Sequence, residues 1–162
     1  MTQKVLVFEP KKCIGCRICE QICSMAHFGI TNPAKSRIRI FRDDAAQMDF
    51  AVYCHQCSDA PCIQACEFDA LVHDKKKGSI RVKKENCIGC RKCIEECPYA
   101  APSIYPTENH ILICDLCGGS PECVENCPEH AIQYLEPGKA ANIYKSVYTD
   151  ELAKKMSHEV EK

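Results

Sequence analysis

The sixteen cysteines of this 162-residue sequence are the residues whose type and spacing could do chemistry. They fall into four quartets, and in each quartet three cysteines lie close together before a fourth follows after three intervening residues. Thiolates are soft ligands, and three on one short loop can hold three corners of an Fe4S4 cube. The quartets are Cys13, Cys16, Cys19 and Cys23; Cys54, Cys57, Cys62 and Cys66; Cys87, Cys90, Cys93 and Cys97; and Cys114, Cys117, Cys123 and Cys127.

Three chemistries compete for these thiols. An even number of cysteines suits a disulfide framework, but the sequence carries no secretory signal, which predicts a cytoplasmic protein with reduced thiols. Zinc sites usually separate two cysteine pairs by a dozen or more residues, whereas a third cysteine follows almost at once here. The sequence therefore favours four 4Fe-4S clusters, which would use all sixteen thiolates as metal ligands.

The remaining composition supplies few residues for an ordinary hydrophobic core. Leu, Ile, Val and Phe make up only about a fifth of the chain, close to the fraction at which highly charged chains are disordered. The net charge of −1 gives no reason to expect a nucleic-acid partner. No apolar stretch is long enough for direct membrane insertion, and no nucleotide-binding or nucleophile motif occurs. These observations argue against an enzyme and favour a protein whose fold is built around metal clusters in place of a large hydrophobic core.

The order of the quartets indicates an internal repeat. The first and third quartets have the same spacing, in CIGCRICEQIC and CIGCRKCIEEC, while the second and fourth have a longer middle gap. Each type occurs twice in alternation, which is the signature of a duplicated unit.

The run C-x2-C-x2-C-x3-C-P resembles bacterial ferredoxins, in which the last cysteine binds the other cluster of a pair. Cys97-Pro98 and Cys127-Pro128 keep the proline, but Cys23-Ser24 and Cys66-Glu67 do not. Four such quartets resemble the four-cluster electron-transfer subunits of molybdenum and tungsten oxidoreductases. The resemblance implies an α+β fold, a duplicated dicluster ferredoxin with two intertwined lobes of short strands and helices.

The resemblance also implies which cysteines share a cluster, since the outer quartets exchange their last cysteines and the inner quartets do the same. The implied sets are Cys13, Cys16, Cys19 with Cys127; Cys114, Cys117, Cys123 with Cys23; Cys54, Cys57, Cys62 with Cys97; and Cys87, Cys90, Cys93 with Cys66.

The domain organisation follows from this exchange. Residues 1–53 are expected to hold the first loop and a hairpin-like excursion, and residues 54–105 the inner lobe. Residues 106–136 would return to complete the outer lobe with residues 1–30. Residues 137–162 are expected to be a C-terminal arm and helix for docking to a partner or for self-association.

Local patterns predict the connecting elements. Alternating apolar and polar residues over 36–42, followed by 48–53, predict a hairpin. Residues 75–78 predict a turn that leads into a strand at 79–82. Thr149 is a candidate N-cap for a helix over 149–160, which predicts an extended arm over 140–148.

Three further residues are candidates for roles near the clusters. Arg17 and Arg91 follow a loop cysteine in the first and third quartets, and either bind the cofactor through its negative charge or lie solvated on a tight turn. His55 lies between Cys54 and Cys57, and is expected to donate to a sulfide or to be exposed, since no cysteine is missing for it to replace.

These features predict a non-catalytic subunit that relays single electrons. The resemblance is strongest to the small iron-sulfur subunit of tungsten aldehyde oxidoreductases, so the expected partners are a large catalytic subunit and a flavin or other electron-exit subunit. A freely diffusing polyferredoxin and a subunit of a hydrogenase or carbon monoxide dehydrogenase are the alternatives.

Overall fold

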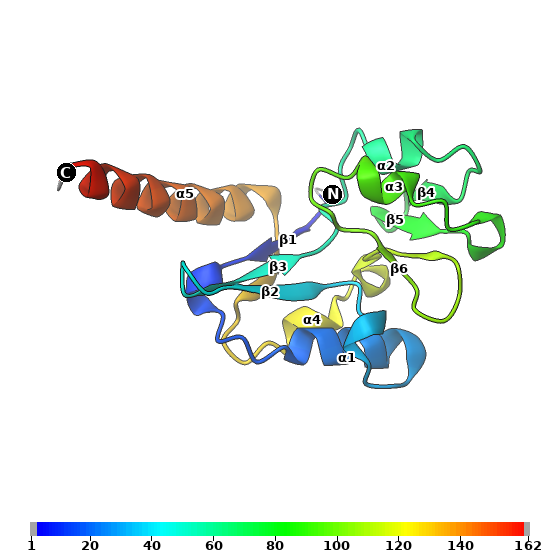
Figure 1. Ribbon diagram of the computed structural model, residues 1–162, viewed down its shortest axis with the longest axis horizontal. Coiled ribbons are helices and arrows are strands. Elements are labelled where there is room, and N and C mark those ends of the chain that lie inside the picture. The colour runs from blue at the N-terminus through cyan, green and yellow to red at the C-terminus, as the bar shows by residue number, and fades with distance from the viewer. Residues whose placement is uncertain (1–2, 161–162) are drawn as a thin grey trace.

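The computed structural model describes residues 3–160, without the side chains of residues 148 and 150–160. Its elements are short strands joined by loops and by one-turn helices, apart from the longer α1 and α5 (Figure 1). The strands are β1 Val5–Phe8, β2 Arg39–Asp43, β3 Met48–Val52, β4 Leu71–Asp74, β5 Ser79–Val82, β6 Ser103–Ile104, β7 Ile111–Leu112 and β8 Ile132–Leu135. The α-helices are α1 Ile18–Phe28, α2 Pro61–Gln64, α3 Lys92–Glu95, α4 Glu122–Glu125 and α5 Pro137–Val160. Short 3-10 helices are Pro10–Lys12, Pro33–Lys35, Lys84–Asn86 and Leu116–Gly118. This is the α+β class that the sequence predicts.

The strands pair as four antiparallel two-stranded sheets. The β2–β3 pair confirms the hairpin that the alternation predicts. The predicted turn at residues 75–78 and the strand at 79–82 are also confirmed, and this strand, β5, pairs with β4, a pairing that was not predicted. The β1–β8 pair joins the two ends of the folded body, with Val5 opposite Leu135 and Phe8 opposite Ile132. Residues near the N-terminus are therefore fixed beside residues that follow the last quartet.

Each α-helix from α1 to α4 contains the third cysteine of a quartet in its first turn, directly after the loop that carries the first two. The residue before the helix is left-handed at three of the four positions, with φ of 57° at Arg17, 35° at Ala60 and 71° at Arg91. A left-handed residue reverses the chain sharply. The loop cysteines and the helix cysteine can thereby face the same point.

The core consists of two clusters of buried residues, and cysteines belong to both. One is built around Leu6, Ile40 and Leu116, from segments near both ends of the chain. The other is built around Leu71 and Ile80 and draws only on residues 54–114. The thin apolar composition is thus divided between two small cores, each incomplete without its thiols.

The C-terminal helix differs from the prediction. Helix α5 begins at Pro137, so the expected extended arm over 140–148 is wrong and Thr149 is not an N-cap. Proline suits the first turn of a helix because its φ is already helical and it needs no N–H partner there. The Thr149 hydroxyl instead donates to carbonyl oxygens of the preceding turn, at Lys145 and Ser146.

Only the first turns of α5 lie against the body, where Ala140 is buried and the Tyr144 hydroxyl donates to the Leu6 carbonyl of β1 at 3.4 Å. The rest of the helix projects away from the strands (Figure 1). Across residues 3–160, no helix has the length and apolar character needed to cross a membrane.

Candidate metal centres

The sixteen thiols are all free and form four groups of four, which we number I to IV. The thiols of groups I and IV line two separate hollows, and those of groups II and III lie close enough for the charge of one to act on the next. In every group the fourth thiol comes from a different quartet, which is the exchange that the ferredoxin resemblance implies. Group I is Cys13, Cys16, Cys19 and Cys127; group II is Cys114, Cys117, Cys123 and Cys23; group III is Cys54, Cys57, Cys62 and Cys97; group IV is Cys87, Cys90, Cys93 and Cys66.

The loops of groups I and IV have the same backbone form because they share the sequence CIGCR. Gly15 and Gly89 have φ of 67° and 70°, and the arginines two residues later are also left-handed. A Cβ at Gly15 would lie 2.7 Å from Asp49 Oδ2. This position therefore needs glycine both for its left-handed backbone and for the lack of space beside Asp49. The side chains of Arg17 and Arg91 are exposed at the rims of the two hollows. Their cofactor-binding role stays a prediction.

Backbone amides point at several of the sulfurs. Ala70 and Ala101 donate to the fourth thiols of groups IV and III, Cys66 at 3.3 Å and Cys97 at 3.4 Å. The amide of Arg37 donates to Cys23 of group II at 3.3 Å. Such bonds stabilise negative charge on sulfur, and they are the contacts that tune iron-sulfur sites.

The electrostatics of the groups suit a bound cation. Burial, with a smaller contribution from the neighbouring thiols, raises the pKa of Cys54 and of Cys93 to about 12. Without a cation these thiols therefore stay protonated, since thiolates that face one another in a poorly solvated site repel. A metal cluster at the centre of each group would supply the opposing charge, and thiolates are the ligands that it prefers. The residues present thus fit 4Fe-4S clusters.

The four groups follow one another in a line. Cys19 of group I acts on Cys123 of group II, Cys54 of group III on Cys114 of group II, and Cys62 of group III on Cys93 of group IV. Both ends of this line reach the surface, because Cys16 in group I and Cys90 in group IV are the exposed thiols. Apolar side chains are exposed beside them, with Ile14 63% exposed at one end and Ile88 53% exposed at the other.

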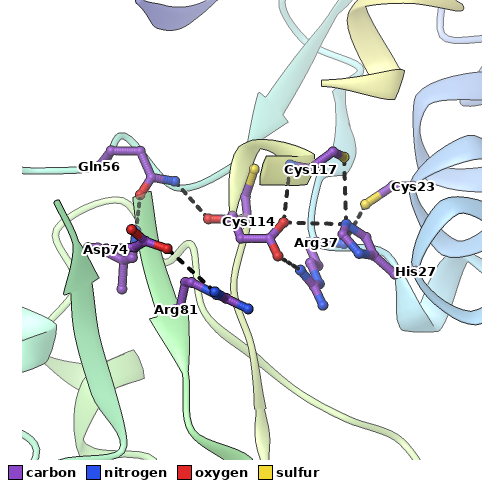
Figure 2. Close-up of polar contacts among 10 residues, drawn as sticks. Cys23, His27, Arg37, Gln56, Asp74, Arg81, Cys114 and Cys117 are labelled. Atoms are coloured by element: carbon purple, nitrogen blue, oxygen red, sulfur yellow. Dashed lines mark hydrogen bonds and ion pairs between the residues drawn. The ribbon is translucent and has the colours of Figure 1, made fainter. Parts of the chain in front are cut away.

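Group II has a polar surround that the sequence analysis did not identify (Figure 2). His27 Nε2 lies 3.7 Å from Cys117 Sγ and 3.5 Å from Asp115 Oδ1. Arg37 Nη1 pairs with Asp115 Oδ2 at 2.7 Å. Burial raises the pKa of Asp115, but Arg37, His27 and the Cys117 amide together outweigh burial and hold this pKa below its usual range. Burial lowers the pKa of His27, and Arg37 lowers it further.

One sequence signal could have located this histidine. His27 follows Cys23 by four residues on α1, so the two side chains share a face of the helix. Asp115 is adjacent to Cys114, but nothing in the sequence brings Arg37 to it, because 78 residues separate them.

Gln56 connects groups II and III (Figure 2). Its Nε2 donates to the Cys114 carbonyl at 2.7 Å, while its Oε1 accepts from the Ile80 amide at 2.6 Å. Its own amide donates to Cys54 Sγ at 3.4 Å. One side chain therefore ties the fourth quartet to the hairpin of the other core.

His55 is half-buried and not exposed, and its expected bond to a sulfide stays a prediction. It is stacked between Tyr53 and Tyr99, with ring centroids 4.8 Å and 4.0 Å away. Burial in this stack lowers the pKa of His55. Its role in the described structure is aromatic packing beside group III.

Four sets of cysteine thiols, held by loops and short helices around two small cores, define a ferredoxin-like iron-sulfur protein of electron transport. The chain belongs to the family of the 4Fe-4S dicluster domain, whose model matches residues 45–137.

Similar proteins agree with this family. The chain is 41% identical to the polyferredoxin-like subunit of aliphatic sulfonate oxidoreductase from Pyrococcus furiosus, over 90% of this chain and 84% of that one. It is 36% identical to the putative electron transport protein YsaA of Escherichia coli, over 84% of this chain and 92% of that one. Among solved structures, a chain of the active site complex BamBC of benzoyl coenzyme A reductase is similar, with a TM-score of 0.52, 25% identity and coverage of 100% of this chain and 99% of that one.

Proposed function

We propose that this chain is the electron-transfer subunit of an oxidoreductase complex and that groups I to IV each hold one 4Fe-4S cluster, with all sixteen cysteines as ligands. The observation that carries this proposal is the division of the thiols into four sets of four. A 4Fe-4S cluster, when bound, accepts and gives up one electron at a potential that its surroundings set. The chain itself is proposed to be non-catalytic.

The residues of the chain would hold, order and insulate these centres. Because the groups lie in a line, an electron has a continuous route between the surface at Cys16 and the surface at Cys90. The buried residues Leu116 and Ile132 pack among the thiols of groups I and II, and Leu71 and Ile80 among those of groups III and IV. Such packing shields the buried sulfurs from water, while Cys16 and Cys90 stay exposed at the two ends of the line.

A large catalytic subunit is the proposed partner. In the Pyrococcus furiosus relative, the similar chain is a subunit of an oxidoreductase, and the similar solved chain comes from an active site complex. We propose a tungsten or molybdenum partner of the aldehyde oxidoreductase type, with a flavin or other subunit at the opposite end of the line. Sixteen free thiols favour a cytoplasmic location, where thiols stay reduced.

We also propose that the chain arose by duplication. The shared left-handed glycine and arginine of the loops at Gly15–Arg17 and Gly89–Arg91 support this origin. The boundaries 1–53, 54–105, 106–136 and 137–162 are the corresponding proposed units.

Anaerobic purification tests the function directly. We expect about sixteen iron and sixteen sulfide atoms per chain, with electron paramagnetic resonance signals of 4Fe-4S clusters after reduction. A colourless protein that contains zinc instead would contradict the cluster assignment.

The same preparation separates a subunit from a free carrier. A dedicated subunit co-elutes in a fixed ratio with a large chain at native expression levels, and α5 truncated after residue 146 should then bind that chain less well. A freely diffusing polyferredoxin, the second candidate, would elute alone with its full complement of iron.

A further inference from the structure

Group II is distinguished from the other groups by the kind of donor that reaches its sulfurs. In groups III and IV, the donors to sulfur among the described residues are backbone amides, at Gln56, Ala70 and Ala101. Group II has a backbone amide at Cys23 and, in addition, the imidazole of His27 at Cys117. A side chain can be exchanged without moving the loop, so this contact is a separable element of control.

The geometry decides which ring nitrogen carries hydrogen. His27 Nε2 faces Cys117 Sγ at 3.7 Å and Asp115 Oδ1 at 3.5 Å. When ionised, both atoms can accept a hydrogen bond but cannot donate one. A bare nitrogen lone pair would be repelled by both, so Nε2 must carry a proton whatever the charge of the ring. The imidazole is therefore a donor toward the ligand sulfur.

The donor is also held in place. Asp115 is fixed by Arg37 Nη1 at 2.7 Å and accepts the Cys117 amide at 3.2 Å, so the carboxylate that shares the His27 proton cannot turn away (Figure 2). The His27 side chain is only 14% exposed and makes an edge contact with Phe28. Arg37 offsets the negative charge of Asp115, which leaves the polarised N–H as the contribution of the network to the sulfur.

We propose that His27 is a positioning residue that raises the reduction potential of group II by donating a hydrogen bond to Cys117. The inference rests on the proposed function, because it requires a cluster in group II. A donor stabilises the additional negative charge that arrives with an electron, so the reduced state gains more than the oxidised state. The step is the gain of one electron from an adjacent group, with no bond broken. An electron passing along the line would therefore be held more strongly at group II than in a protein without the His27 donor.

Two variants of matched shape test this role in the full-length protein. His27→Gln keeps an N–H donor near the position of Nε2, whereas His27→Met has similar length and no donor. His73→Met is the control, since His73 is exposed on β4. The readout is a potentiometric titration of the four centres by electron paramagnetic resonance, with the transition altered in Cys117→Ser identified as that of group II.

We expect His27→Met to lower one midpoint potential, that of group II. In His27→Gln, all four midpoint potentials should stay near those of the wild type. Equal potentials in both variants and the wild type, or a shift of all four centres, would overturn the proposal. Loss of about a quarter of the iron from His27→Met alone would show a structural role and would also overturn it. A wild-type protein without iron and sulfide would refute the proposed function itself, before any variant is compared.

Discussion

Groups I and II are neighbours in the line of thiols, yet the chain surrounds them in opposite ways. Group I lies in a hollow whose walls include Phe8, Ile40 and Ile132, and its loop places Cys16 at the surface. Group II lies among a histidine, an aspartate and an arginine. The ligand atoms are the same, so the difference lies entirely in the surroundings.

The contrast separates two tasks. If the proposed clusters are present, a terminal centre would exchange electrons with another protein, and the exposed thiol and apolar side chains at group I would provide a close approach for it. In group II, the polar side chains would instead set how strongly the centre holds charge. Access and control are thus assigned to different groups of one chain.

The largest effect should come from removing a ligand of either group. Cys123→Ser places a hydroxyl at a buried position in group II, and we expect about four iron atoms to be lost per chain with a lower thermal stability. Cys16→Ser alters an exposed ligand, where water or the hydroxyl can complete coordination, and most of the iron should remain. Iron analysis of anaerobic protein distinguishes the two. Equal iron loss from both variants would remove the contrast in accessibility.

A smaller effect should come from filling a glycine in each loop. Gly15 and Gly118 have φ of 67° and 73°, so alanine at either costs about 1–2 kcal/mol for its left-handed backbone. At Gly15 the new methyl also meets the buried carboxylate of Asp49 at 2.7 Å, which adds about 1–3 kcal/mol of overpacking. At Gly118 it meets only the end of the flexible Lys77 side chain at 3.2 Å. Thermal melting should show the larger drop for Gly15→Ala, and the reverse order would show that the first loop is the more adaptable one.

The smallest effect should come from the link between group II and the second core. Gln56→Met keeps the length of the side chain but leaves the Cys114 carbonyl and the Ile80 amide without their bonds to it. We expect a loss of about 1–3 kcal/mol in stability, while iron content stays unchanged. The control is Gln64→Met, at an exposed glutamine in α2. Equal melting temperatures for the two variants would show that Gln56 is not a structural link.

The sequence predicts well where chemistry constrains spacing. The ligand loops and the exchanged fourth cysteines follow from the quartets and the ferredoxin resemblance, since a metal cluster allows few loop lengths. The β2–β3 hairpin follows from alternation, and the turn before β5 follows from its turn residues, which are local signals. In contrast, the sequence predicts a helix that begins at Thr149, because threonine is a common N-cap. Helix α5 begins at Pro137, where proline suits the first turn.

Contacts between residues that lie far apart in the sequence could not be predicted. The ring stack of His55 depends on Tyr99, and the surround of group II depends on Arg37 reaching Asp115. Such contacts are set by how the two cores pack, and residue spacing along the chain carries no trace of them. Only the i, i+4 relation of Cys23 and His27 was within reach of local reasoning.

The exchange of fourth cysteines between distant quartets, like the pairing of β1 with β8, brings together residues that are made at different times during synthesis. Groups III and IV draw only on residues 54–97, so their thiols are all present before the fourth quartet at residues 114–127 is made. Groups I and II wait for Cys127 and Cys123, which lie further along the chain. Because chains emerge N-terminus first, the thiols of the first loop remain unsheltered longest, and maturation of the molecule must proceed from its middle outward.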